Sequence, residues 1–123
     1  MRAFESCALP NEAFHHRDHL RLARLYLLAA DCGAASERFA KSLLRFATHH
    51  GGAQKYHRTM LLAWMHLIAA AMRESPAATF DELLAAHPEL VNRHALLAYY
   101  SRGRLATDSA QTGWVEPDLQ PLP

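Results

Sequence analysis

Hydrophobic residues recur at every third or fourth position along most of the chain, and charged residues fill many of the positions between them. This spacing is typical of amphipathic α-helices, whose side chains repeat about every 3.6 residues. β-branched residues are scarce, and no alternation of apolar and polar residues persists over the length of a strand. The sequence therefore predicts an all-α protein with helices over about residues 11–31, 37–50, 55–74, 79–86 and 88–100.

Capping residues mark the expected ends of these helices. Asn11 is expected to be the N-cap of the first helix, Gly33 to end it, and Ser36 to cap the second. Thr79 and Glu82 have the spacing of a capping box at the start of the fourth. The loops between the first three helices are short, which favours antiparallel neighbours.

These features predict a small up-down helical bundle of four to five helices. At 123 residues the chain has the length of one domain, covering residues 1–123. About the first ten residues form an N-terminal arm in this prediction, and one or two further helical turns follow residue 105. The last segment, residues 115–123, holds three of the six prolines and is expected to be an extended, Pro-rich tail.

Composition narrows the environment and the partners. The formal net charge is +1, so no overall field favours nucleic acid or an anionic membrane surface as a partner. The longest apolar stretch, residues 61–72, is interrupted by His66 and is too short to span a bilayer. The two cysteines, Cys7 and Cys32, lack the spacing of a redox or zinc motif, and the N-terminus has no signal-peptide core. We therefore expect a cytoplasmic protein.

Histidine is the unusual residue of this chain, with nine copies. Three of them lie close together in the first predicted helix. Measured around the helix axis from Arg17, His15 falls at roughly 160° and His19 at roughly 200°. Glu12 shares this face, opposite the arginine, and His16 lies at its edge. The pattern predicts two inward histidines and a borderline third.

The second and third predicted helices each add an inward histidine. His50 lies on the apolar face of the second helix, in its last turn, and His57 lies on the apolar face of the third, near its start. In an antiparallel bundle the start of the first helix, the end of the second and the start of the third meet at one end. We therefore expect His15, His19, His50 and His57 to converge.

A converging set of imidazoles favours a metal ion. Each buried polar group without a partner costs roughly 1–3 kcal/mol, and one cation satisfies several rings together. Nitrogen donors suit zinc, iron, copper or nickel. The sequence thus predicts a transition metal ion on His15, His19, His50 and His57, with His16 as an auxiliary ligand and Glu12 as a ligand or general base. Open coordination positions would permit hydrolysis or oxidation of a small-molecule substrate.

Other interpretations of the histidines stay open. The rings could form a polar or catalytic cluster without metal, or be unrelated to one another. Glu12 and His15 have the E-x-x-H spacing of di-iron bundles, but those proteins need a second such motif, which the chain lacks. His94 is a reserve ligand, and His87, which precedes Pro88, is expected to be a cap or surface residue.

The C-terminal tail suggests a different function. Trp114 precedes the Pro-rich segment and would serve as an apolar anchor. An extended segment of this kind can pack across the bundle, dock on a partner protein or bind a second copy of the chain as a homodimer. The alternative prediction is therefore a non-catalytic helical interaction module that uses Trp114 and the tail.

Overall fold

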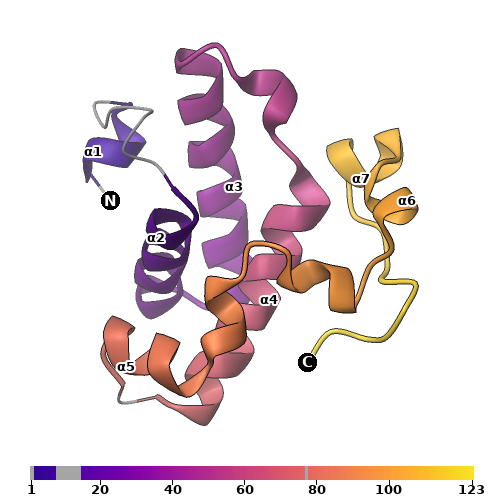
Figure 1. Cartoon of the computed structure of the whole chain (residues 1–123). Coiled ribbons are helices and arrows are strands. Elements are labelled where there is room, and N and C mark those ends of the chain that lie inside the picture. The colour runs from indigo at the N-terminus through magenta and orange to yellow at the C-terminus, as the bar shows by residue number, and fades with distance from the viewer. Residues whose placement is uncertain (1, 8–14, 77) are drawn as a thin grey trace. The chain divides into compact units, whose positions relative to one another are not determined.

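The computed structural model describes residues 2–7, 15–76 and 78–123 (Figure 1). Every regular element among these residues is a helix, which confirms the predicted all-α fold. The chain divides into two compact units, Met1–Tyr56 and His57–Pro123. The predicted single domain rests on chain length and stays a prediction.

The first unit is built around a pair of antiparallel helices (Figure 1). Their bounds and those of the shorter elements are α1 Arg2–Glu5, α2 His16–Ala29, α3 Cys32–His49 and the 3₁₀ helix η2 Ala53–Lys55. Only two residues separate α2 from α3, so the two helices fold back on each other. The start of α2 and the end of α3 therefore point toward the same end of this pair.

Aromatic rings form the core of the first unit. Tyr26 of α2 stacks on Phe39 of α3, with ring centroids 5.1 Å apart. Phe4 of α1 packs against Phe39 at 5.8 Å and against Phe46 at 5.1 Å. All four rings are buried. Burying aromatic side chains of this size contributes more to stability than the short helix α1 could gain from its own hydrogen bonds.

Glu5 joins α1 to both long helices. Its carboxylate accepts hydrogen bonds from the Tyr26 hydroxyl at 2.8 Å and from the Arg38 guanidinium at 3.0 and 3.1 Å. The bonds from Arg38 and then Tyr26 lower the pKa of Glu5 below its ordinary value. Burial, above all, raises the pKa of Tyr26 to about 12, so its hydroxyl remains a donor.

The second unit begins with the long helix α4, Arg58–Glu74, which carries most of its buried residues. Shorter helices follow it along the chain. They are α5 Phe80–Ala86, the 3₁₀ helices η3 Pro88–Val91 and η4 Ala95–Ala98, α6 Arg102–Leu105 and α7 Asp108–Thr112. The predicted capping box of α5 is confirmed, because Thr79 and Glu82 exchange side-chain and backbone hydrogen bonds.

Several predicted helix ends are wrong for identifiable reasons. The helix α3 starts at Cys32 because the Asp31 side chain accepts the N–H of Ala34, so Ser36 lies inside the helix and is buried. Gly33 falls in its first turn and does not end the preceding helix. The helix α2 starts at His16, after its N-cap His15, and the predicted cap at residue 11 lies outside the described residues.

The predicted helix over residues 88–100 is also wrong. The structure has two 3₁₀ helices there, η3 and η4, separated by a turn. The side chain of Asn92 accepts the backbone N–H of His94 at 2.9 Å, which is a local bond that competes with helix continuation. The third predicted helix starts at Arg58 instead of residue 55, because His57 is its N-cap.

The tail, residues 115–123, contains neither helix nor strand, as predicted, and it is bonded to the rest of the second unit. The N–H of Leu119 donates to the Tyr99 carbonyl at 2.9 Å, and the Gln120 amide donates to the Ala98 carbonyl at 2.9 Å. The Asp118 carboxylate accepts hydrogen bonds from the backbone N–H of Ser101 at 2.8 Å and from its hydroxyl at 2.6 Å. The tail therefore runs along the segment between η4 and α6.

Across the described residues, none of the helices combines the length and the apolar character needed to cross a membrane. The longest helix, α3, is amphipathic, with buried residues on one side and exposed charged residues on the other. Packing of amphipathic faces within each unit stabilises the long helices α2, α3 and α4.

Replacing Glu5 by Gln should weaken the attachment of α1. The amide loses the charge that holds Arg38, so we expect the free energy of unfolding at neutral pH to fall by about 1 kcal/mol. Because folding lowers the pKa of Glu5, its contribution is present above the ordinary value of 4.5 and is lost as the pH falls through the lower folded value. Urea unfolding followed by circular dichroism measures both effects.

The matched control is Glu37→Gln, which makes the same chemical change on an exposed side chain of α3. This variant should unfold within about 0.5 kcal/mol of the parent. In the Glu5→Gln variant the loss of stability on acidification should be smaller than in the parent. Identical acid dependence in the two proteins would contradict the role given to Glu5.

Candidate functional site

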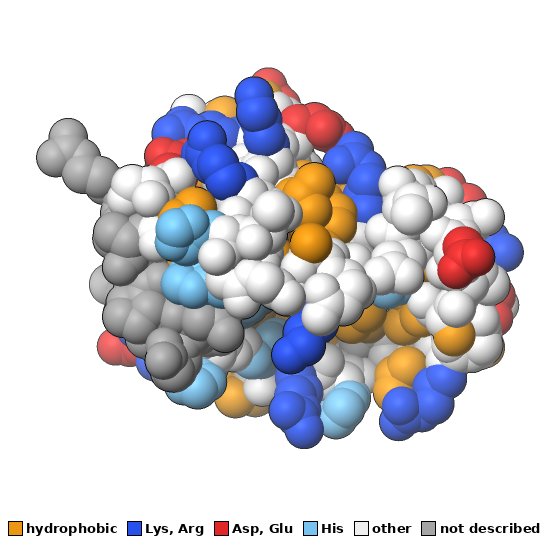
Figure 2. Space-filling model, turned by 90° about the horizontal axis from the view of Figure 1, so that it is seen from above, with side chains coloured by type: hydrophobic (Ala, Val, Ile, Leu, Met, Phe, Trp, Pro, Cys, Tyr) orange, Lys and Arg blue, Asp and Glu red, His pale blue; other side chains and the backbone are white. Residues whose placement is uncertain are grey.

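The nine histidines differ widely in exposure, and none is fully buried. Several are visible on the face drawn in Figure 2, with Lys and Arg side chains on the same face. The exposed ones are His15, His49, His66 and His94. The other five rings are half-buried and have restricted access to water, so their nitrogens need hydrogen-bond partners within the protein. They are His16, His19, His50, His57 and His87.

His15 does not occupy the inward position predicted for it. It is the N-cap of α2, has an extended backbone and is exposed. Its N–H donates to the Asp18 carboxylate at 2.9 Å, which satisfies a backbone donor at the start of the helix. The prediction assumed a helix already running at residue 12. Glu12 itself, its proposed partner in the site, lies outside the described residues.

His19 and His16 are the half-buried histidines of the first turn of α2. Burial lowers the pKa of His19 to about 4, with a further lowering from the charge of His16 and an opposing effect of Asp18. The ring of His19 is therefore neutral at pH 7. A neutral imidazole is the form that binds metal ions or accepts hydrogen bonds.

His50 follows the last turn of α3 and is half-buried. Its ring lies 4.5 Å from the Phe46 ring and 4.9 Å from that of His49, measured between centroids. Within the part of the chain that the structure describes, the Nε2 atom of His50 is buried and has no hydrogen-bond partner. A polar atom in this state costs roughly 1–3 kcal/mol, so it is a natural position for a ligand or ion.

His57 has a structural role that uses both ring nitrogens. Its Nδ1 accepts the N–H of Met60 at 3.1 Å and caps α4, while its Nε2 lies 2.7 Å from the carbonyl oxygen of Leu105. This arrangement requires a proton on Nε2, which donates to Leu105. A metal ion could bind this ring only by breaking one of the two bonds.

The four predicted metal ligands fall in both units. His15, His19 and His50 belong to the first, and His57 belongs to the second. Among residues 2–7, 15–76 and 78–123, no group of three or more His, Cys, Asp or Glu side chains is arranged to hold a metal ion. The predicted convergence of the four rings, and the metal ion with it, stay predictions.

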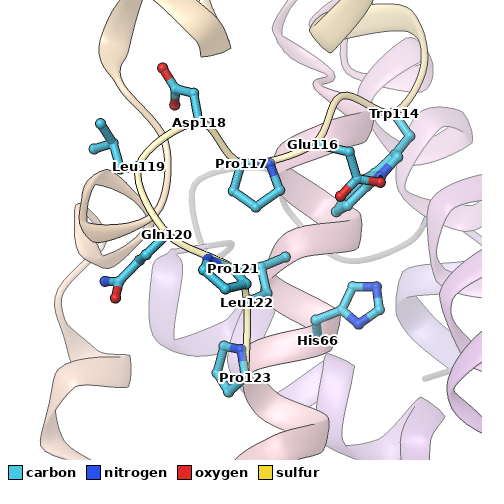
Figure 3. Close-up of a pocket in the computed structure, with 10 residues that line it drawn as sticks. All are labelled: His66, Trp114, Glu116, Pro117, Asp118, Leu119, Gln120, Pro121, Leu122 and Pro123. Carbon is cyan, nitrogen blue, oxygen red and sulfur yellow. The ribbon is translucent and has the colours of Figure 1, made fainter.

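The second unit contains a pocket that the histidine pattern does not indicate. We call it the tail pocket; it is open, has a volume of about 690 Å³ and is bordered by α4 and the tail (Figure 3). His66 projects from α4, with its ring centroid 5.7 Å from that of Trp114. The remaining lining residues come from the tail: Glu116, Pro117, Asp118, Leu119, Gln120, Pro121, Leu122 and Pro123.

Two of the polar side chains that line the tail pocket are carboxylates, those of Glu116 and Asp118. The Trp114 indole N–H donates to the Glu116 carboxylate at 2.9 Å, which fixes the indole beside a negative charge. Asp118 is bonded to Ser101, and its side chain points away from His66 in Figure 3. None of the described residues that line this pocket is a Lys or Arg. Burial raises the pKa of the nearby Tyr100 hydroxyl to about 12, and the negative charge of Glu116 contributes to this increase.

A second cavity of about 360 Å³, also in the second unit, surrounds His87. The sequence suggested only a cap or surface residue at this position. Its imidazole lies between the carboxylates of Glu74 and Glu89. No sequence motif could have revealed this group, because Glu74 ends one helix and the other two residues follow a different helix. Only the folding of α5 back toward α4 brings them together.

Substituting His57 separates its structural role from metal binding. We expect His57→Ala to lower the free energy of unfolding by about 1–2 kcal/mol, because α4 loses its cap and Leu105 loses a donor. His57→Asn keeps a side-chain acceptor for the cap and should lie between Ala and the parent. Urea unfolding with and without a chelator is the measurement.

The two roles give different results in this experiment. If His57 acts through Met60 and Leu105, the differences between the three proteins are the same with and without the chelator. A difference that disappears when metal is removed would show that the ring stabilises the chain as a ligand instead.

Comparison with known proteins gives no relative for this chain. No protein-family model, curated protein or solved structure matches it. The geometry and chemistry of the described residues therefore carry the functional conclusion.

Proposed function

We propose that this chain is a binding protein whose tail pocket receives a flat organic cation, presented as an arginine side chain of a partner protein. The observation that carries the proposal is the composition of this pocket. It combines an indole and an imidazole with carboxylates and with rigid proline rings, and no Lys or Arg is among the described residues that line it.

The aromatic groups favour a planar cation. Trp114 is 37% exposed, so part of its indole is accessible to a ligand, and the exposed ring of His66 lies beside it, with centroids 5.7 Å apart. A guanidinium group stacks on an indole through cation–π attraction and is less strongly hydrated than an ammonium group. The rings of Pro117 and Pro121 add apolar surface for the methylene groups of an arginine side chain.

The charge distribution favours the same ligand. The Glu116 carboxylate uses one oxygen to accept the Trp114 N–H, and its second oxygen has no hydrogen-bond partner within the described residues. That oxygen can accept a guanidinium N–H while the guanidinium stacks on the indole. A neutral or anionic ligand would leave this carboxylate without a counter charge.

The pocket is held in shape before any ligand binds. Hydrogen bonds fix the middle of the tail: Asp118 accepts from Ser101, and the next two tail residues donate to the carbonyls of Tyr99 and Ala98. The Arg104 guanidinium also donates to the Glu116 carbonyl, at 2.9 Å. A preorganised site loses less conformational entropy on binding than a mobile segment would. The tail is thus a wall of the binding site in this proposal and not a free arm that wraps a partner.

The test uses the indole signals in ¹H–¹⁵N NMR spectra of the whole chain. The chain has two tryptophans, and the Trp64→Phe variant assigns the signal of Trp114. N-acetyl-arginine amide should shift that signal saturably, and Glu116→Gln should weaken the affinity at least about fivefold through loss of a charge-assisted bond. The matched control is Asp108→Asn, an exposed carboxylate outside the pocket, which should bind as the parent does.

A second ligand checks the chemistry. N-acetyl-citrulline amide has nearly the shape of the arginine compound and lacks its charge. Equal binding of the two compounds, or no saturable shift of the Trp114 signal, would rule out the proposed site.

We propose metal binding by the first unit as a second candidate function, favoured by the unpartnered Nε2 atom of His50. His19 supplies a neutral ring, and His16 lies in the same first turn of α2. Because α2 and α3 are antiparallel, these rings and His50 belong to the same end of the helix pair. The present side-chain arrangement is not a formed site, so binding would include rotamer changes.

Metal content and affinity test this candidate. Untagged protein would be analysed for bound metal and titrated with Zn²⁺ and Ni²⁺ by calorimetry. His19→Ala combined with His50→Ala should weaken the affinity at least about tenfold. The control carries His66→Ala and His94→Ala, which remove two exposed rings from the second unit. Equal affinities of the two double variants would eliminate the candidate.

We place either function in the cytoplasm. Cys7 and Cys32 are free thiols, as expected for a reducing compartment.

A further inference from the structure

The cavity around His87, which we call the His87 pocket, is bounded by separate segments of the second unit. One apolar side comes from α4, through Leu67, Ala70 and Ala71. The 3₁₀ helices contribute the other, through Leu90, Ala95 and Ala98. Four of these six residues are alanines, whose small side chains leave about 360 Å³ unfilled. This is within the range of small-molecule sites, roughly 300–1,000 Å³.

His87 is much less exposed than the two carboxylates of this pocket, with 13% of its side chain accessible. Its Nε2 atom lies 3.7 Å from a carboxylate oxygen of Glu74, and its Nδ1 atom lies 3.5 Å from one of Glu89. Both separations exceed the length of a good N–H···O hydrogen bond. The carboxylate side chains are 75% and 64% exposed, and neither accepts a hydrogen bond within the described residues.

The charges of the pocket are unbalanced. Among the residues that the structure describes, its lining includes two carboxylates and two imidazoles, those of His87 and His94, and no Lys or Arg. With both imidazoles neutral the two carboxylates give these side chains a charge of −2, and protonation of one ring leaves −1. The carboxylates lie at the border of a cavity that has apolar side chains on two sides, which positions them to receive the charged end of a ligand whose alkyl end is buried.

We infer that the His87 pocket binds a small aliphatic primary amine. The ammonium group lies between Glu74 and Glu89, beside the imidazole, and the alkyl chain lies along the alanines. An ammonium group has three N–H donors, enough to serve both carboxylates and one ring nitrogen of His87 at once. A metal ion fits less well, because the described residues offer no group of three or more ligands to it.

The pocket differs from the tail pocket in the cation it selects. The tail pocket offers the exposed face of Trp114, which suits a flat, delocalised charge. The His87 pocket offers two separate carboxylates and an aliphatic floor, which suit a compact charge on a short chain. The inference does not depend on the function proposed for the tail pocket.

The experiment is a titration of the ¹⁵N-labelled whole chain with n-butylamine at neutral pH, where the amine is protonated, followed by ¹H–¹⁵N NMR. Saturable shifts should be confined to residues around His87. The double variant Glu74→Gln and Glu89→Gln keeps the shape and removes the charge, so it should weaken the affinity at least about tenfold. Ala98→Leu, at an exposed position on the border, should also weaken it by filling the cavity.

Two controls make the outcome decisive. n-Butanol has nearly the shape of the amine without its charge, and it should give no saturable shifts. Asp108→Asn should bind n-butylamine as the parent does, because this exposed carboxylate lines neither pocket. No saturable binding, equal binding of the alcohol, or unchanged affinity of the Glu74→Gln and Glu89→Gln double variant would each overturn the inference.

Discussion

Hydrogen bonding of a tail without secondary structure is the constraint on which the second unit depends. Backbone N–H and C=O groups outside helices need hydrogen-bond partners elsewhere in the chain. The partners of the tail lie in α4 and in the segment between η4 and α6. The buried Thr59 hydroxyl donates to the Gly113 carbonyl at 2.8 Å and accepts the N–H of Val115 at 3.2 Å. The Tyr100 hydroxyl donates to the Val115 carbonyl at 2.8 Å. These two side chains anchor the start of the tail, and the rest of it forms one wall of the tail pocket and ends at the His87 pocket.

The half-buried histidines of this chain differ in the partners of their ring nitrogens. His57 satisfies both nitrogens with backbone groups and thereby caps α4. His19 is held neutral by burial, and His50 retains a buried nitrogen without a partner. His87 stands between two carboxylates at the border of a cavity. What a buried imidazole can do therefore depends on which of its nitrogens the backbone has already used.

Local patterns predicted the parts of the fold that local physics controls. Helical periodicity identified α2 through α5, and the capping box at Thr79 was correct because all of its bonds lie within four residues. The same reasoning failed at Asn92, whose side chain accepts the backbone N–H of His94 where a continuous helix was predicted. It also failed at Asp31, which caps α3 and makes the helix begin before the predicted cap, Ser36. In both cases two competing local bonds were available, and the sequence does not reveal which one prevails.

The sequence by itself determined the all-α class, the amphipathic faces and the extended tail, because these follow from residue spacing and from proline. It also identified Trp114 as a candidate anchor. The tertiary structure alone decided that Trp114 meets His66, that Glu74 and Glu89 flank His87, and that His57 bonds to Leu105. These contacts join residues that share no local pattern. They exist because α4 and the segments after it fold back on one another within the second unit, and periodicity along a helix carries no information about that folding.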